Sequence, residues 1–406
     1  LSSSSAASDV YKRQRQAFDL QMGKTPARNR PDYWNGDHKW ISIADIGNAG
    51  KFLTKTKESI TKAGIDGSGI KVVPQGTVIM SFKLSIGKTA ITSEDMYTNE
   101  AIMAFIGNGK FAVDTDYLYH LCCGTNWTAG TNKAVMGLTL NKATLLEKKI
   151  PLPDINEQHE IATKLDKIDA IIAERQQQLE LIDQAVKSRF IELFGDPERN
   201  PKKWPVVSIT EIIRGKVSNG FFAKRDAYRN DGNVQVLGVA NIVNRMYSNI
   251  EGLPRTNATQ AEKEKYRVRY GDMLFCRSSL VAEGIGKASI VPQDTPQNVI
   301  FECHVIRLPL DLQKCVPEFV QELSTTPYFR KQIIAQSKTA TMTTIGQDGI
   351  LKAAIILPPV ERQQEFLRFV EQTDKSKYYS SLSFRYCQAA ANTYRQEWMT
   401  CRTSDF

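Results

Sequence analysis

The spacing of hydrophobic residues changes along the chain, and the change predicts which segments are strands and which are helices. Residues 40–50 (WISIADIGNAG) begin as an alternating apolar stretch and end in polar residues, which predicts a strand and its exit turn. In residues 161–190 the apolar residues instead recur mostly at steps of three or four. That spacing predicts a helix with an apolar seam, formed by Ile161, Leu165, Ile168, Ile172, Leu179, Ile182, Val186 and Phe190.

The predicted helix has recognisable ends. Asp154 and Glu157 follow Pro153 with the spacing of a capping box, and Gly195 and Pro197 are typical of a helix C-terminus. The run of about 37 residues between these signals would be roughly 55 Å long. This length and polarity favour a spacer that pairs with a second helix over a helix packed on its own domain.

The chain also repeats itself. Four blocks of the first half match four blocks of the second half in the same order: 40–50 with 236–246, 73–82 with 268–277, 87–91 with 286–290, and 139–169 with 344–374. In the second pair a Gly-Thr or Gly-Asp turn precedes a short apolar strand. In the last pair Gln158 aligns with Gln363. The sequence therefore predicts two copies of one structural unit, each ending in a helix.

The second helix begins near Val360 but loses its apolar pattern after Lys377. Either this segment packs differently or the reading frame is wrong there, and we favour a frame or assembly error. Residues 1–14 (LSSSSAASDVYKRQ) look like translated sequencing-adaptor DNA. We therefore expect residues 1–16 to lie outside the fold and the true start to be missing.

The composition indicates what kind of partner and what environment the chain has. Of 406 residues, 41% are hydrophobic and 24% charged, which is normal for a globular protein, and the net charge of +9 favours an acidic partner such as nucleic acid. The seven cysteines lack CxxC spacing, which argues against a disulfide framework and a zinc site and favours a reducing cytoplasm. No run of roughly 18 apolar residues indicates a membrane span.

Three motifs resemble a known family. Residues 191–212 (IELFGDPERNPKKWPVVSITEI), residues 150–169 with their echo at 355–374, and residues 23–46 resemble, in order, segments of Type I restriction–modification specificity subunits. The resemblance covers roughly residues 17 to 376. It departs from the family at both ends, where the adaptor-like leader replaces the usual Trp-Pro start and the last helix is degraded.

The resemblance implies an α/β (α+β) fold with two tandem target-recognition domains, each with a twisted β-sheet, separated by long antiparallel coiled-coil spacer helices. The expected limits are a leader at 1–16, recognition domains at 17–150 and 196–358, a central spacer helix at 151–195, and a C-terminal spacer helix at 359–406 that is degraded after about 377. The implied role is host defence. The chain would bind double-stranded DNA at a bipartite site and position two methyltransferase (M) subunits and the restriction/translocase (R) subunits. No cofactor is expected in this chain, and S-adenosylmethionine, ATP and Mg²⁺ are expected on the partner subunits.

The residues themselves offer no catalytic motif. GKT occurs at Gly23 and Gly87, but Phe18 and Phe82 stand where a P-loop needs its first glycine. The Asn/Asp-Pro-Pro-aromatic motif of amino-methyltransferases does not occur, and the four histidines are scattered. We therefore expect a non-catalytic DNA-binding subunit. The alternatives are the recognition part of a single-chain restriction–modification enzyme and an assembly scaffold that binds no DNA.

DNA contacts are expected from basic and amide side chains in loops, since Lys and Arg bind phosphates and Arg, Lys, Asn and Gln read base edges. Those of the first copy are Lys24, Arg28, Arg30, Lys83, Lys88, Asn126 and Lys133. Those of the second copy are Lys216, Lys224, Arg225, Arg277, Lys287 and Lys338. Residues 24–30 are taken as a structureless basic loop beside Tyr33 and Trp34, and Trp127 as either a packing residue or a DNA contact.

Overall fold

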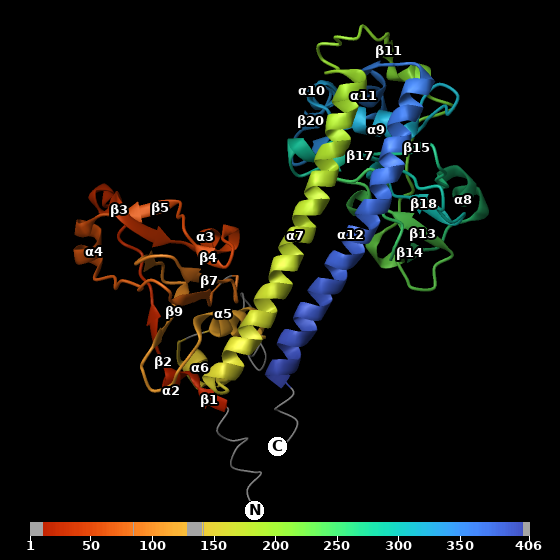
Figure 1. Cartoon of the computed structure of the whole chain (residues 1–406). Coiled ribbons are helices and arrows are strands. Elements are labelled where there is room, and N and C mark those ends of the chain that lie inside the picture. Colours follow the sequence, from red (N-terminus) through yellow and green to blue (C-terminus); the bar gives the residue numbers. More distant parts are fainter. Residues whose placement is uncertain (1–10, 84, 128–139, 141, 401–406) are drawn as a thin grey trace, which may run out of the picture. The chain divides into compact units, whose positions relative to one another are not determined.

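The structure is a computed structural model, and it describes residues 11–83, 85–127, 140 and 142–400. The chain divides into two compact units: unit 1 comprises Leu1–Gln176 and Leu382–Phe406, and unit 2 comprises Gln177–Ser381. Each unit has a β-rich body and parts of two long helices, α7 (Ile155–Phe194) and α12 (Val360–Thr400) (Figure 1). The predicted domain limits at residues 150, 195 and 358 stay predictions.

Unit 1 contains two main sheets. The five-stranded sheet has the order β2 (Phe18–Met22), β9 (Ile102–Gly107), β6 (Val78–Ser81), β7 (Thr89–Thr92) and β4 (Phe52–Leu53). The three-stranded sheet has the order β5 (Glu58–Ile60), β3 (Trp34–Ile41) and β8 (Tyr97–Thr98). The helices of this body are η1 (Pro31–Tyr33), α3 (Ile43–Asn48), α4 (Lys62–Ser68), α5 (Thr115–Gly124) and α6 (Lys142–Glu147).

Unit 2 repeats this plan. Its four-stranded sheet has the order β12 (Ser218–Asn219), β19 (Val305–Pro309), β15 (Asp272–Cys276) and β17 (Ala288–Ile290). Its three-stranded sheets are β14 (Arg255–Thr256), β13 (Val234–Leu237) and β18 (Val299–Phe301), and β16 (Ser278–Ser279), β21 (Thr343–Thr344) and β20 (Lys338–Thr339). The helices are η2 (Ile209–Ile212), η3 (Arg225–Ala227), η4 (Val239–Asn241), α8 (Gln260–Tyr266), η5 (Ala282–Gly284), α9 (Pro317–Thr325), α10 (Pro327–Ala335) and α11 (Gln347–Leu351).

The predicted repeat is confirmed strand by strand. β6 pairs antiparallel with β7 and β9, as β15 pairs with β17 and β19. β3 pairs antiparallel with β5 and parallel with β8, as β13 pairs with β14 and β18. The turns before β6 and β15 contain Gly76 at φ 73° and Gly271 at φ 89°, a left-handed conformation that favours glycine. The fold class is therefore two tandem α/β units, as the resemblance implied.

Two aligned glutamines, one in each copy, make the same hydrogen bond to the N-cap residue of a helix. Gln158 is 1% exposed and its Oε1 accepts from the Asp114 N–H (2.9 Å), while Gln363 is 0% exposed and accepts from the Val316 N–H (2.8 Å). Asp114 and Val316 are the N-cap residues of α5 and α9. Each glutamine thus ties the first turn of a long helix to a helix of its own unit.

The ends of α7 pack into the cores of the two units. Ile161 and Leu165 belong to the core of unit 1, and Val186 and Phe190 to that of unit 2. The remaining seam residues, Ile168, Ile172, Leu179 and Ile182, are half-buried. The predicted helix ends are confirmed, because the Asp154 carboxylate accepts from the Glu157 N–H (3.1 Å) and Gly195 has φ 78°.

Within unit 2 the two long helices run antiparallel. Lys377 contacts Asp183 at 2.6 Å, and Arg189 contacts Glu365 at 2.7 Å, so residues later in α7 lie beside residues earlier in α12. Phe190 and Phe366 pack edge to face with ring centroids 5.6 Å apart. The paired spacer helices implied by the resemblance are therefore present in this unit.

The prediction that residues 1–16 lie outside the fold is wrong for residues 11–16. β1 (Tyr11–Arg13) pairs antiparallel with β10 (Lys149–Pro151), and α2 (Gln14–Ala17) follows it. The corresponding ladder in unit 2 joins β11 (Val206–Ser208) to β22 (Ala354–Ile356). Strand pairing uses main-chain N–H and C=O groups, so the polar composition of this segment does not prevent it.

The predicted C-terminal helix is present as α12, which continues through the segment without an apolar pattern and ends at Thr400. A helix needs local hydrogen bonds rather than an apolar seam, and this segment contains neither glycine nor proline. Its last part is also held by unit 1, where Ala391 is 1% exposed and Tyr394 packs against the core.

Candidate nucleic-acid interface

The first predicted basic loop, residues 24–30, is ordered by aromatic and acidic neighbours. The Arg28 guanidinium lies 3.9 Å from the Trp34 ring centroid, and its Nη2 donates to Glu58 at 3.0 Å. The hydrogen bond with Glu58 raises the pKa of Arg28, and the same bond lowers the pKa of Glu58. Residues 24–30 contain no helix or strand, as predicted, and η1 begins directly after them at Pro31.

The other two cations of this loop, Arg30 and Lys24, contact different kinds of partner. Arg30 forms a two-point ion pair with Asp32, at 2.9 and 2.7 Å, and lies over the Tyr33 ring. Lys24 Nζ donates to the Ser68 carbonyl at 3.2 Å. All three cations are exposed. Both arginines would have to exchange a carboxylate for a phosphate, whereas Lys24 would give up a neutral acceptor.

The remaining candidates of unit 1 lie in separate loops. Lys83 follows β6, with Nζ 5.3 Å from the Phe82 ring centroid, and exposed Lys88 lies just before β7. Asn126 follows α5, and its backbone carbonyl accepts from Lys148 Nζ (2.7 Å). Lys133 lies outside the described residues. Trp127 is 4% exposed, and its Nε1 donates to the Cys122 carbonyl (2.8 Å), which makes it a packing residue.

In unit 2 the first group of candidates lies around β12. Lys216 precedes this strand, Lys224 is the N-cap of η3, and Arg225 is the first residue of η3; all three are exposed. Two aromatic residues separate them, of which Phe221 is 9% and Phe222 69% exposed. The segment presents cations and one exposed ring on the same short stretch.

The structure brings Arg277 and Lys338 together although they are far apart in sequence. Arg277 follows β15 directly, and its carbonyl accepts from the Ile345 N–H (3.0 Å), next to β21. In the small sheet Thr344 pairs with both Ser278 and Lys338. His304 completes the group, since its Nδ1 lies 2.7 Å from Ser278 Oγ. Lys287 lies opposite Cys276, whose N–H donates to the Lys287 carbonyl (2.8 Å), and the Lys287 Nζ donates to Asn244 Oδ1 at 2.7 Å.

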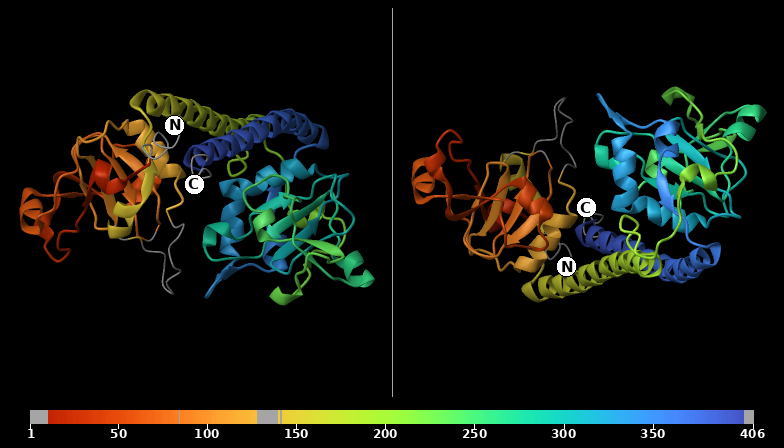
Figure 2. Two further views of the ribbon diagram at one scale, coloured as in Figure 1. Left: turned by 90° about the horizontal axis from the view of Figure 1, so that it is seen from below. Right: turned by 90° about the horizontal axis from the view of Figure 1, so that it is seen from above.

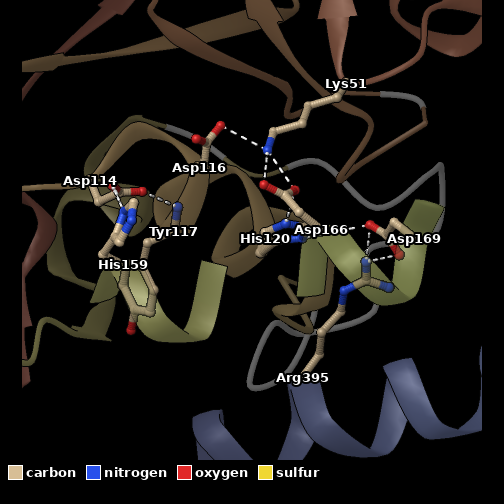
Figure 3. Close-up of polar contacts among 9 residues, drawn as sticks. All are labelled: Lys51, Asp114, Asp116, Tyr117, His120, His159, Asp166, Asp169 and Arg395. Atoms are coloured by element: carbon tan, nitrogen blue, oxygen red, sulfur yellow. Dashed lines mark hydrogen bonds and ion pairs between the residues drawn. The ribbon is translucent and has the colours of Figure 1, made fainter. Parts of the chain in front are cut away.

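Sequence reasoning missed a network of charges in unit 1. Lys51 Nζ lies 2.8 Å from Asp116 and 2.6 Å from Asp166 (Figure 3). His120 Nε2 lies 2.8 Å from Asp166 Oδ1, and its Nδ1 lies 3.7 Å from Asp169. This network joins α5 and the β-rich body to the first turns of α7.

The same network continues to α12. Arg395 Nη2 lies 2.7 and 2.6 Å from the two carboxylate oxygens of Asp169, as Figure 3 shows. Its side chain is 15% exposed. The ion pair therefore fastens the C-terminal part of α12 to unit 1. No sequence signal predicted it, because the partners are separated by more than two hundred residues.

Burial sets the protonation of this network. Burial lowers the pKa of His120 and outweighs the attraction of Asp166 and Asp169. Burial acts in the opposite direction on Asp166, but the hydrogen bonds from Lys51 and His120 outweigh it and lower the pKa of this carboxyl. Burial therefore favours the neutral form of His120, and its neighbours favour the ionised form of Asp166. The contacts of the network connect α5 and the β-rich body to α7 and α12.

Among the described residues, no group of three or more His, Cys, Asp or Glu side chains could hold a metal ion. In the same part of the chain, no helix is long and apolar enough to cross a membrane.

Two copies of one α/β body, each with basic loops and each attached to long paired helices, define a class of protein that presents two recognition surfaces. The family model described as "Type I restriction modification DNA specificity domain" matches residues 10–182 and 201–378. The chain belongs to this family, and its two matched segments correspond to its two structural copies.

Curated relatives carry the same description over most of the chain. The Type I restriction enzyme MjaIX specificity subunit of Methanocaldococcus jannaschii is 24% identical over 374 residues, which covers 87% of this chain and 84% of that protein. The EcoKI specificity subunit of Escherichia coli is 28% identical over 246 residues, or 55% of this chain and 50% of that protein.

Solved structures show the same fold. A chain from a structure concerned with complex assembly and conformational transition of the type I R-M system has a TM-score of 0.56 at 17% identity, with 96% of both chains covered. The S subunit of a Type I restriction–modification system from M. genitalium has a TM-score of 0.50 at 11% identity, with 96% of this chain and 95% of that chain covered.

Proposed function

We propose that this chain is the DNA-reading subunit of a Type I restriction–modification complex, with each unit reading one half of a bipartite duplex site. The observation that carries the proposal is the duplication, in which one framework occurs twice in a family described as a DNA specificity domain. The net charge of +9 adds attraction to phosphates.

The chain itself performs no chemistry in this proposal. It binds double-stranded DNA and positions two methyltransferase subunits and the restriction/translocase subunits, which carry S-adenosylmethionine, ATP and Mg²⁺. The relatives named as specificity subunits support this division of labour. The purified chain alone is accordingly expected to transfer no methyl group from S-adenosylmethionine to DNA. Methylation by the partner-free chain would overturn this part of the proposal.

Mapping of methylated bases tests the reading function directly. A host carrying the complete operon should methylate one bipartite sequence. Replacing residues 23–146 with the corresponding segment of another family member should change one half of that sequence and leave the other intact. A change spread over both halves, or no change, would contradict two independent readers.

Salt dependence distinguishes sequence reading from a scaffold role. The assembled complex should bind its methylated sequence more tightly than random duplex, and both affinities should fall as salt rises, because each phosphate contact releases counterions. Equal affinity for both duplexes would refute sequence-specific reading.

A further inference from the structure

Unit 2 displays an unusual group of exposed apolar side chains, which we call the apolar tip: Leu280, Val281 and Met342. Their exposed fractions are 83%, 58% and 37%. Ser279 pairs with Thr343 in the small sheet, so the next residues, Leu280 and Met342, leave the ladder at the same end. The hairpin of β20 and β21 projects from the body of unit 2 in both views of Figure 2 (blue).

The tip is a feature of this copy rather than of the shared framework. Between the aligned positions Arg277 and Gly286 lie eight residues, whereas four lie between Phe82 and Gly87 in the first copy. The longer loop is folded, since the Val281 carbonyl accepts from the Gly284 N–H (3.1 Å) and the Glu283 carbonyl accepts from Arg330 (3.1 Å). A folded insertion therefore holds two aliphatic side chains outward.

The surroundings of the tip favour duplex DNA as the occupant. Exposed Lys338 lies in the same three-stranded sheet, and Arg277 and His304 lie at its base. Glu283, also exposed, is the acidic residue of the loop itself. Cations beside an apolar projection match a groove, where phosphates flank base edges and the thymine C5-methyl is the apolar group.

We propose that Leu280 contacts a thymine methyl group in the half-site of unit 2, and that Lys338 contacts a neighbouring phosphate. This inference rests on the proposed function and deepens it, because it names the chemical group that the tip reads. Leu280 then acts as a specificity-determining residue, while Lys338 adds affinity without sequence preference.

Replacing single thymines by deoxyuridine tests the contact, since that change removes one methyl group. The probe is the wild-type sequence of the assembled complex, with each thymine of the unit 2 half-site replaced in turn. Replacement of the thymine that Leu280 contacts should weaken binding of the wild-type complex about four-fold, which corresponds to the free energy of burying one methyl-sized group. The complex with Leu280→Ala should bind the thymine and deoxyuridine duplexes equally.

The matched control is Leu312→Ala, which shortens another leucine of unit 2 that is 49% exposed. It should retain the full preference for thymine. Lys338→Ala should weaken binding to all duplexes alike and reduce the slope of affinity against salt.

Two outcomes would overturn the inference. One is a wild-type complex indifferent to deoxyuridine at every thymine, or an equal preference in wild type and Leu280→Ala. The other is a Leu280→Ala chain that fails to assemble with its partner subunits, which would make the tip a protein contact. If the wild-type complex prefers no defined duplex at all, the proposed function fails instead.

Discussion

Replacing Gln363 with leucine should destabilise unit 2 and leave unit 1 unchanged. Gln363 is fully buried, accepts from the Val316 N–H at 2.8 Å and donates to the Pro358 carbonyl at 2.7 Å. Leucine keeps much of the volume but leaves both backbone groups buried without partners, at about 1–3 kcal/mol each. The free energy of unfolding should fall by about 2–5 kcal/mol, which lowers the melting temperature by roughly 5–15 °C.

The first copy allows the corresponding experiment in unit 1. Gln158→Leu removes the acceptor of the Asp114 N–H (2.9 Å) and the donor to the Pro153 carbonyl (2.8 Å), so it should destabilise unit 1 by a similar amount. Gln364→Leu is the control, because this neighbouring glutamine is exposed and its loss should change stability by less than about 0.5 kcal/mol.

Hydrogen–deuterium exchange followed by mass spectrometry can assign each loss to a unit. Gln363→Leu should lower protection of the α9 and β22 amides, and Gln158→Leu that of α5 and β10. A loss below about 1 kcal/mol, or equal loss of protection in both units, would refute the reasoning. Gln363→Glu tests the direction of the pH dependence of stability. The second carboxyl oxygen of the glutamate would face the Pro358 carbonyl, where only the protonated form can donate a hydrogen bond. The pKa of this glutamate is therefore expected to be raised in the folded state, and the stability of the variant should increase as the pH falls.

Three further predictions concern the helices and the charge network. Inserting four residues after Gln176, matched by four after Ser381, lengthens both helices by about 6 Å, so the unspecified gap in the methylated sequence should grow by one or two base pairs, at about 3.4 Å each. An active complex with an unchanged gap would show that these helices are not the spacer. Because the pKa of His120 is lowered, the folded state binds fewer protons than the unfolded state, and unit 1 should lose stability as the pH falls below about 6.5. His120→Asn should flatten that loss in denaturant titrations at pH 7.5 and 5.5, and an unaltered pH profile would contradict it. Arg395→Met removes the ion pair with Asp169 and should accelerate amide exchange in the last turns of α12. Unchanged exchange there would mean that packing alone holds the segment.

The repeat could be predicted from the sequence because short local motifs specify its elements. A glycine turn followed by a short apolar strand specifies β6 and β15 without reference to the rest of the chain. The cap at Asp154 and the stop at Gly195 are equally local, and both predictions are confirmed. The loss of the apolar period after Lys377 was taken as a sign of a frame or assembly error, yet α12 continues to Thr400 through a segment that lacks glycine and proline.

The partners of Lys24 and Arg28 could not be predicted, because they come from distant segments. Arg28 pairs with Glu58 across thirty positions, and Lys24 donates to the Ser68 carbonyl across 44. These two basic residues, counted as available from their sequence context, therefore already have partners in the folded chain. The same limit applies to Trp127, whose polar environment in sequence gave no sign that its ring would be buried in the core.

In each copy, the residues that hold the fold together differ from the residues that we propose to read DNA. The buried strands and the glutamines that hold α5 and α9 are the same in both units, since they must satisfy the same backbone groups. The loop after β15 is four residues longer than the loop after β6, and it exposes the side chains of Leu280 and Val281. Because an exposed side chain contributes little to folding, such a loop can change its target at small cost in stability. The framework positions lack that freedom, since a buried polar group left without a partner costs more than a surface contact contributes.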